Sequence, residues 1–338
     1  NEVEPKVVQT MVDTIVKNYK IVEDFYLFKA KVLKLNKLET YDLYAPVTSS
    51  RKKVDFDKAQ QIVLAAFKEF NEKYFFAGKE FFDKGWIDVL PKDGKRGGAF
   101  CDYGLPNHHP YILLNYTNNL RQVLTLAHEL GHGIHARFFK NQPLLNFDTP
   151  LTIAETSSVF AEILVFDNLK KQITNKKELF PLYMGKIEDT FATVFRQIGM
   201  YRFEQELHNR RRTKGELAKE EIGEIWQKTR KEMFGKAVNI DKNSSNWWSY
   251  VPHFIHTPFY VYAYAFGELL TLSLYVKYKK DSDSFVQKYL DFLKAGGSKS
   301  PDELLKPLGI NLENPDFWQG GIDYIKDLIK EAKELYKH

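Results

Sequence analysis

Two histidines and a glutamate lie close together in the middle of the chain, with a spacing that suits a metal site. Three residues separate His128 from His132, and Glu129 directly follows the first histidine. The apolar residues around them recur at helical spacing, so we expect a helix that places both imidazoles on one face, with Cα atoms roughly 6 Å apart. Two imidazoles at that separation can bind one metal ion together.

The side-chain types in this stretch favour a catalytic zinc ion. Neutral imidazole nitrogens bind zinc at about 2.0–2.1 Å, and a catalytic site adds a third protein ligand and a water molecule. Glu129 would lie beside the ion, where its carboxylate can take a proton from that water. The alternative is an accidental spacing on a buried helix, but buried ionisable side chains are costly unless they are paired or bind a metal.

A third ligand must come from elsewhere in the sequence. A histidine six residues after His132, as in the metzincin class, is excluded because residue 138 is Phe. His135 is a poor candidate, since it points well round the helix from the other two histidines. Glu155 lies 23 residues after His132, which leaves room for a turn and an antiparallel return. Its apolar neighbours favour a buried carboxylate that is paired or bound to a metal.

The rest of the chain predicts a mainly α fold with one small β-sheet. Apolar residues recur at helical spacing over most of the 338 residues, whereas the segments between 86 and 114 are short, β-prone and bounded by Gly and Pro. We expect a single domain with helices over 1–80, a small sheet over 86–114, metal-site helices over 118–172 and further helices over 178–338.

Several element boundaries also follow from local signals. Asp55 is the expected N-cap of a helix that runs to about residue 76 and stops at Gly78. Asn118 should cap the helix that carries the two histidines. One long helix is expected from residue 178 to about 214. The glycines at 94, 97 and 98 match no full nucleotide-binding fingerprint and predict a turn into an edge strand.

Composition and charge exclude several function classes. The net charge of +5 is small, and Lys and Glu alternate along many stretches, which is typical of solvated helix faces and not of a nucleic-acid surface. The apolar runs are broken by charge well before the 18 residues of a membrane span, and no signal peptide is visible near Asn1. We therefore expect no nucleic-acid or membrane partner.

The chain contains a single cysteine, Cys101, so no intramolecular disulfide is possible. A reducing compartment is the default for such a chain, and we expect a cytoplasmic protein. No activating partner is visible near this thiol in the sequence. We interpret Cys101 as a small apolar residue of a strand and not as a nucleophile.

Several separated motifs occur in an order that resembles one known family. They are His128-Glu129-Leu130-Gly131-His132, Ile153-Ala154-Glu155-Thr156, Pro252-His253-Phe254 and the aromatic run over 259–267. The stretches 41–44 and 94–100 add to the match, which covers most of the chain. Together they resemble oligoendopeptidase F and its thimet-oligopeptidase relatives. Members of that family usually carry a further helical region before this part, so we expect the chain to represent the catalytic portion without the N-terminal lobe.

The resemblance implies a zincin-type catalytic domain that hydrolyses short oligopeptides inside a deep channel. It implies that one zinc ion is bound by His128, His132 and Glu155, with Glu129 as the general base. A histidine and tyrosines of a late helix should face the substrate, and the matching positions are His253, Tyr264 and, with a less certain placement, Tyr260. His256 competes with His253 for that role, and the Pro-His-Phe context favours His253.

Other residues carry two interpretations each. Glu162, seven residues after Glu155, either accepts a hydrogen bond from a ligand histidine or pairs with an Arg or Lys. We expect Phe259 and Phe266 to belong to the core, and a substrate peptide to add as a strand beside residues 98–101. Two alternatives stay open. A zinc-binding but non-catalytic peptide-binding protein is disfavoured by Glu129, because a structural zinc site has no use for a base, and a helical scaffold protein would bind no stoichiometric zinc. The oligomeric state is not predicted.

Overall fold

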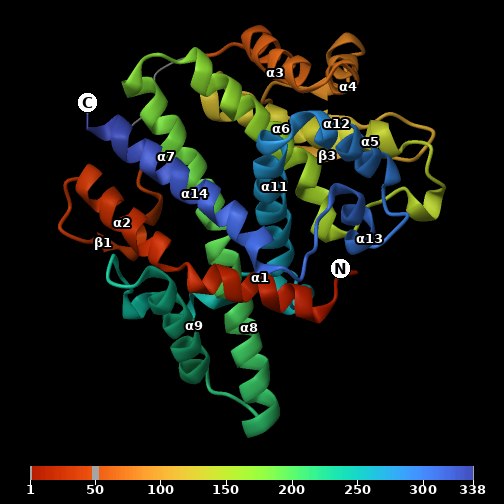
Figure 1. The fold of residues 1–338 in the computed structure, drawn as a ribbon. Helices are drawn as coiled ribbons and strands as arrows, with labels where there is room; N and C mark the ends of the chain where they lie inside the picture. The colour runs from red at the N-terminus through yellow and green to blue at the C-terminus, as the bar shows by residue number, and fades with distance from the viewer. Residues whose placement is uncertain (1, 48–52, 338) are drawn as a thin grey trace.

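The computed structural model describes residues 2–47 and 53–337, which form a mainly helical structure (Figure 1). The α-helices of the described residues are α1 (Pro5–Lys17), α2 (Lys20–Val32), α3 (Phe56–Phe70), α4 (Glu72–Asp83), α5 (Leu120–Phe139), α6 (Leu151–Gln172), α7 (Lys176–Thr193), α8 (Phe195–Lys214), α9 (Lys219–Phe234), α10 (His253–His256), α11 (Tyr262–Lys280), α12 (Ser282–Ala295), α13 (Pro301–Leu305) and α14 (Pro315–Tyr336). Short 3-10 segments cover Thr40–Tyr44, Leu144–Asn146, Lys242–Tyr250 and Lys306–Leu308. The predicted mainly α fold is confirmed.

The helices begin where short polar side chains can bind free backbone N–H groups. Asp55 accepts a hydrogen bond from the N–H of Lys58 at 2.7 Å and caps α3, as predicted. Asn119 caps α5 in the same way, one residue later than predicted, while Asn118 adopts a left-handed backbone conformation with φ of 60°. An Asn tolerates that conformation better than most residues, so the turn before α5 can close.

A layer of three helices forms the centre of the molecule. α6 packs against α5 on one side and against α11 on the other, and α14 crosses the far side of α11 (Figure 1). The residues of α11 from Ala265 to Tyr275 are all buried, which requires partners all round the helix. Glu155 thus lies on a helix, α6, that packs directly against this buried helix, and α5, which carries His128 and His132, packs next to it against α6.

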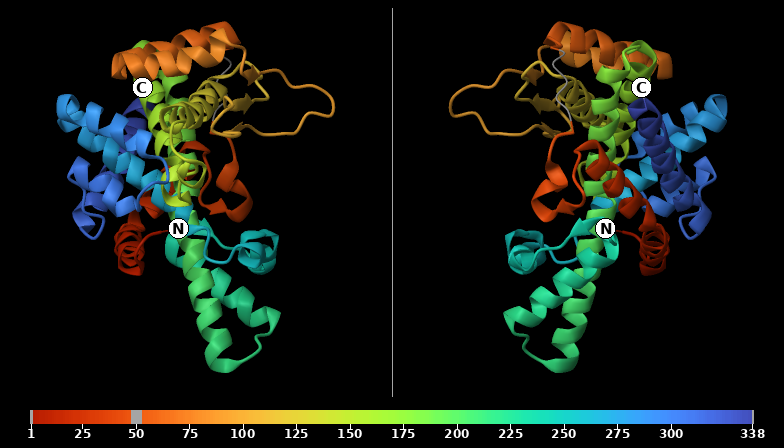
Figure 2. Two further views of the ribbon diagram at one scale, coloured as in Figure 1. Left: turned by 90° about the vertical axis from the view of Figure 1, so that its right-hand side faces the viewer. Right: turned by 90° about the vertical axis from the view of Figure 1, so that its left-hand side faces the viewer.

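A three-stranded sheet covers one side of α5. The strands are β2 (Ile87–Asp88), β3 (Phe100–Asp102) and β4 (Tyr111–Leu113), in the order β2-β4-β3. β2 runs parallel to β4, and β3 runs antiparallel to it, with Cys101 opposite Ile112. The sheet over 86–114 is thus confirmed, and β3 is an edge strand as predicted. A long loop between the strands projects from the body of the molecule (Figure 2).

The structure corrects two predicted helix boundaries. The helix expected from Asp55 to about residue 76 ends at Phe70, and α4 begins at Glu72 after its cap residue Asn71. Gly78 therefore does not end a helix but lies inside α4, where a Cβ atom would come within 3.0 Å of the Phe67 ring. The expected helix over 178–214 is divided at Val194 into α7 and α8. The sequence also gave no sign of the short parallel pairing between β1 (Leu38–Glu39) and β5 (Val238–Asn239), whose strands are about 200 positions apart.

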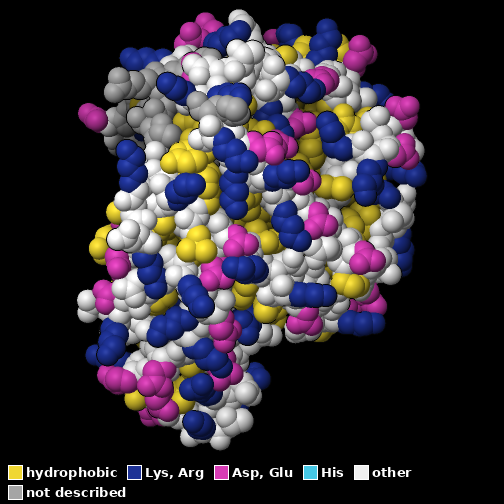
Figure 3. Space-filling model, turned by 60° about the vertical axis from the view of Figure 1, so that its left-hand side comes forward, with side chains coloured by type: hydrophobic (Ala, Val, Ile, Leu, Met, Phe, Trp, Pro, Cys, Tyr) yellow, Lys and Arg dark blue, Asp and Glu magenta, His cyan; other side chains and the backbone are white. Residues whose placement is uncertain are grey.

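The outer surface carries charges of both signs. On the face shown in Figure 3, Lys and Arg side chains alternate with Asp and Glu side chains and no large area has a single sign. α8 and α9 extend away from the body as a narrow arm (Figure 2). No helix among the described residues has both the length and the apolar character that a membrane crossing requires.

Candidate metal centre

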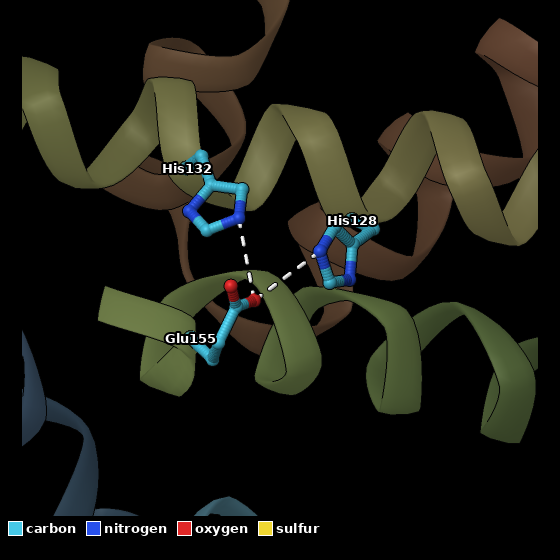
Figure 4. Close-up of side chains that lie close together, drawn as sticks. All are labelled: His128, His132 and Glu155. Atoms are coloured by element: carbon cyan, nitrogen blue, oxygen red, sulfur yellow. Dashed lines mark ion pairs between the residues drawn. The ribbon is translucent and has the colours of Figure 1, made fainter. Parts of the chain in front are cut away.

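Three side chains from two neighbouring helices converge on one point (Figure 4). His128 and His132 come from α5, and Glu155 comes from α6. The Oε2 atom of Glu155 lies 3.3 Å from Nε2 of His128 and 3.4 Å from Nε2 of His132. Four ligands at about 2.1 Å around a zinc ion are separated from one another by about 3.4 Å in tetrahedral geometry. The two separations from Glu155 therefore match those around a shared zinc ion, and all three ligand atoms lie within 4.8 Å of one another.

Small residues allow the helices to approach closely enough for this convergence. A Cβ atom on Gly131 of α5 would lie 2.5 Å from the backbone oxygen of Ser157, and the Ser157 hydroxyl donates to the Gly131 oxygen at 2.8 Å. On the other side of α6, a Cβ atom on Gly267 of α11 would lie 3.0 Å from the Cβ of Glu155. The two glycines thus fix Glu155 between α5 and α11.

Each histidine has a second partner on the ring nitrogen that faces away from Glu155. Nδ1 of His128 lies 3.4 Å from Oε2 of Glu162, and Nδ1 of His132 lies 3.1 Å from the hydroxyl of Tyr103. A partner on Nδ1 orients the ring and selects the tautomer that leaves Nε2 free to bind a metal. The donor set and its outer partners therefore fit a zinc ion.

Glu162 has both of the partners that the sequence left as alternatives. One carboxylate oxygen faces His128, and the other accepts from Nζ of Lys186 at 2.9 Å. Lys186, from α7, is buried and lies 3.6 Å from a carboxylate oxygen of Glu268 on α11, which also accepts from the Thr190 hydroxyl at 3.1 Å. A buried chain of charges thus connects His128 to α7 and α11.

These charges keep the carboxylates of Glu155 and Glu162 ionised and favour a positive charge between them. Burial acts to raise the pKa of Glu155, but the two imidazoles outweigh it and hold that pKa well below the usual value. Burial opposes a proton on His128, yet the carboxylates of Glu155 and Glu162 raise its pKa well above the usual value. Burial is likewise outweighed at Glu162, where Lys186 and His128 lower the pKa to about 2. Such a set of anions favours a divalent cation in place of protons.

Glu129 lies beside the three converging groups and is not one of them. It is 6% exposed, and burial raises its pKa although the two histidines act to lower it. A raised pKa brings a carboxylate closer to the range in which a general base works best near neutral pH. His135, in contrast, is fully enclosed and not part of this group: its ring lies against Phe139 and Phe292, and burial lowers its pKa to about 3.

A cavity of about 430 Å³ opens beside the converging side chains, and its walls include His128, Glu155 and Tyr264. This volume lies within the usual range of ligand-binding cavities. An ion pair between Arg121 and Asp189, at 2.9 Å, contributes to its wall. The site therefore has room for a ligand next to the candidate metal ligands.

The residues of the late motif form one aromatic cluster. The His253 ring stacks on Tyr260 with centroids 5.1 Å apart, and Tyr264 contacts both rings. Burial, followed by the neighbouring Tyr260, raises the pKa of Tyr264, so its hydroxyl stays protonated. His256 is exposed, whereas His253 is half-buried within the cluster. The structure thus places His253, Tyr260 and Tyr264 together, with Tyr264 at the cavity wall.

The two aromatic core predictions have different outcomes. Phe266 is fully buried and contacts Trp318, as expected for a core residue. The prediction for Phe259 is wrong, because this residue is only half-buried and has a left-handed backbone with φ of 59°. Its N–H donates to the buried carboxylate of Glu204 at 2.8 Å. The residue therefore forms part of the turn that carries the cluster.

Sequence reasoning missed Tyr103 and Lys186. Lys186 had a detectable signal, since a lone lysine between Met184 and Ile187 interrupts an apolar stripe of its helix. Tyr103 had none, because it only follows a short strand. Cys101 lies on β3 as predicted, and burial raises the pKa of its thiol. A thiol in that state is a weak nucleophile.

Comparisons with known proteins agree with this architecture. A sequence model described as Peptidase family M3 matches residues 1–324. Oligopeptidase PepF of Bacillus subtilis (strain 168) is 31% identical over 337 residues, which cover 99% of this chain and 50% of that protein. The oligoendopeptidase F homolog of Borreliella burgdorferi is 32% identical over 341 residues, which cover 100% and 58%. The chain thus spans about half the length of the curated relatives it matches.

A solved structure shares the fold. The crystal structure of oligoendopeptidase-F from Enterococcus faecium superposes with a TM-score of 0.76 at 22% sequence identity, and the match covers 99% of this chain and 53% of that one. At this level of identity the similarity concerns the arrangement of helices and the small sheet. The folding pattern of residues 2–47 and 53–337 is therefore one that also occurs within a longer chain.

Proposed function

Because the chain belongs to peptidase family M3, we propose that it is the catalytic portion of a zinc-dependent endopeptidase that hydrolyses short oligopeptides. We propose further that residues 1–338 act as a single catalytic domain. The observation that carries the proposal is the convergence of His128, His132 and Glu155, whose facing atoms are 3.3 and 3.4 Å apart. A purely structural zinc site would not require the neighbouring Glu129.

The residues of the chain divide the work of hydrolysis among them. When bound by the two histidines and Glu155, a zinc ion acts as a Lewis acid and lowers the pKa of water to about 7. Glu129 accepts the proton of the attacking water and then delivers it to the leaving amine. The Tyr264 hydroxyl, which stays protonated, donates a hydrogen bond to the developing oxyanion, and His253 and Tyr260 hold that tyrosine in place.

The edge of the small sheet offers a place for the substrate backbone. β3 pairs with β4 on one side only within the described part of the chain. Tyr103, the residue after β3, contacts His132, so this edge leads directly to the candidate metal ligands. A peptide added beside β3 would gain main-chain hydrogen bonds that depend little on its side chains. This mode of binding suits an enzyme for varied oligopeptides.

The cysteine content and the surface charges bear on where the chain works and what it binds. The one cysteine has no partner for a disulfide, which agrees with a reducing compartment, and we propose that the chain works in the cytoplasm. Its proposed partners are short peptides. The mixed charges of the face in Figure 3 do not favour nucleic acid.

The proposal is tested by zinc content and peptide hydrolysis. The purified chain should contain one zinc ion, cleave an internally quenched peptide and lose that activity with a chelator. Glu129→Gln should keep the zinc and lose at least about 100-fold in kcat, whereas Glu220→Gln, at an exposed position of α9, should leave both unchanged. Zinc without any hydrolysis would support the non-catalytic alternative, and absence of stoichiometric zinc would support the scaffold.

A further inference from the structure

An arginine outside the metal centre is buried without an anionic partner. Arg230 of α9 is 7% exposed, and its Nε atom has no hydrogen-bond partner within the described ranges. Its guanidinium instead lies over the rings of Trp226, Phe234 and Trp247, at 5.5, 5.5 and 5.8 Å from their centroids. Burying a cation without hydrogen bonds is costly, and a guanidinium has five N–H donors to offer. The side chain is therefore poised to bind an anion.

A second arginine faces the same small cavity. Arg196, at the start of α8, is half-buried, donates to the Tyr44 hydroxyl and also has an unpartnered Nε atom. One carboxylate, Glu188, contributes to the wall as well, but it lies 2.8 Å from the ammonium of the buried Lys29. The two arginines thus leave an excess of positive charge, and no ion pair involves either of them among the residues that the structure describes.

The size and rim of this cavity limit the group that it can hold. Its volume is about 40 Å³, and since one water needs about 10–15 Å³ measured in this way, it has room for about three heavy atoms. That is the size of a carboxylate. Three aromatic side chains at its opening, Tyr44, Trp247 and Tyr250, are 64%, 40% and 61% exposed. The cavity wall is mainly apolar, and the charged side chains in it are the two arginines and Glu188. Exposed aromatic residues around an apolar cavity with a few polar groups are typical of recognition sites.

The small cavity adjoins the cavity of the metal centre. Ala192, near the end of α7, lines both of them. The consecutive residues Glu188 and Asp189 of the same helix face one cavity each. The two cavities are therefore neighbours, and a ligand that occupied both would pass Ala192.

We propose that Arg230 and Arg196 form a subsite for a carboxylate of the peptide substrate, and this inference rests on the proposed peptidase function. The carboxylate enters the small cavity and accepts hydrogen bonds from the unpartnered guanidinium N–H groups, while the aromatic rim contacts the adjoining residue of the peptide. Planar guanidinium groups match carboxylates in geometry and bind them more strongly than neutral donors do. The source of the carboxylate is either the C-terminus of the peptide or an acidic side chain.

Matched peptides distinguish these two sources. The two peptides of the first pair differ only in whether the C-terminus is free or amidated. In the second pair, one peptide carries Glu and the other Gln at every position on the C-terminal side of the cleaved bond. The wild-type chain should prefer the carboxylate form of one pair by about tenfold to 100-fold in kcat/KM, the usual range for a charge-assisted contact. Equal rates within both pairs would overturn the proposal.

Substitutions assign the preference to the arginines. Arg230→Gln and Arg196→Gln should each reduce the preference in kcat/KM for the carboxylate peptide to less than about threefold, mainly by raising KM for that peptide. Arg202→Gln is the matched control, since Arg202 lies on α8 but pairs with Glu232 at 2.6 Å, and it should keep the full preference. If Arg230→Gln does not fold, Arg196→Gln and the peptide pairs still decide the question. A folded variant that keeps the full preference would overturn the assignment.

Binding separates this inference from the proposed function. Trp247 lies at the cavity, so its fluorescence should change when a peptide binds to Glu129→Gln. Tighter binding of the carboxylate peptide by Glu129→Gln, together with no hydrolysis by the wild-type chain, would support the subsite and contradict the peptidase function. Hydrolysis by the wild-type chain without any preference for the carboxylate peptide would support the peptidase function and contradict the subsite.

Discussion

Replacing the buried Lys186 by methionine should weaken both the fold and the metal site. Methionine has a similar length and keeps the packing, but it removes the only positive charge that the described residues place between Glu162 and Glu268. The two carboxylates would then remain buried without their cation. Because Glu162 is also the partner of His128 Nδ1, the loss of Lys186 removes the group that holds this carboxylate in place.

The magnitude follows from the contacts of Lys186. Its ammonium lies 2.9 Å from one carboxylate and 3.6 Å from the other, and the side chain is almost completely buried. Breaking a buried ion pair by removing one partner costs about 3–5 kcal/mol. Loss of an outer partner of a ligand histidine lowers metal affinity by about tenfold to 100-fold. We therefore expect effects of that size on the free energy of unfolding and on the zinc dissociation constant.

Urea unfolding followed by circular dichroism measures the first effect, and competition with a chelator measures the second. With an m-value of about 3 kcal/mol/M, the unfolding midpoint should fall by about 1 M or more. Lys326→Met is the control, because its exposed pair with Asp323 at 2.9 Å should contribute less than about 1 kcal/mol. Adding Glu268→Gln to Lys186→Met should restore part of the stability. Unchanged stability and unchanged zinc affinity in Lys186→Met would refute the reasoning.

Two further substitutions test the packing and the titration of the site. Gly131→Ala should destabilise the fold by about 3 kcal/mol or more in thermal unfolding, because the added Cβ would lie 2.5 Å from the backbone of Ser157. Gly185→Ala is the control and should stabilise the fold slightly, because nothing lies within 4 Å of its added Cβ. Equal melting temperatures of the two variants would contradict the packing argument. Burial raises the pKa of Glu204 to about 7, against the opposing N–H of Phe259. Between about pH 4.5 and 7, Glu204 is therefore protonated in the folded state but ionised in the unfolded state. Protonation of Glu204 contributes about 3 kcal/mol to the free energy of unfolding; this contribution is complete below about pH 4.5 and is lost as the pH rises through about 7. Glu204→Gln should flatten the dependence of unfolding on pH over this range, and an unaltered profile would count against the burial of that carboxyl.

The sequence was most informative where the chemistry depends on neighbouring residues of one helix. His128, Glu129 and His132 could be placed relative to one another because helical spacing sets the positions of side chains four residues apart. We could also predict the helices and the sheet over 86–114, because both follow from the periodicity of apolar residues along the chain. The family could be predicted because its motifs occur in the same order along the sequence. The roles of His253, Tyr260 and Tyr264 stay predictions, and the Glu129→Gln variant tests the role of Glu129.

Long-range packing decided what local patterns could not. Gly78 carries the usual signal of a helix end, yet it lies inside α4 because the Phe67 ring packs against it. The pairing of Leu38 with Val238 depends likewise on a contact between distant segments. Such contacts outweigh local preferences, which amount to only about 1 kcal/mol per residue.

The sequence by itself determined the candidate metal-binding pair His128 and His132 and the adjacent carboxylate of Glu129, because their placement follows from spacing along one helix. It also determined the helical character of the chain, because apolar residues recur at helical spacing over most of it. Only the tertiary structure brought Tyr103 to His132, Lys186 to Glu162, and Arg196 and Arg230 to one cavity. The physical reason is that the protonation state and the binding partners of a buried charged side chain depend on the groups packed around it. Those groups come from other helices and strands, whose positions relative to one another no local pattern specifies.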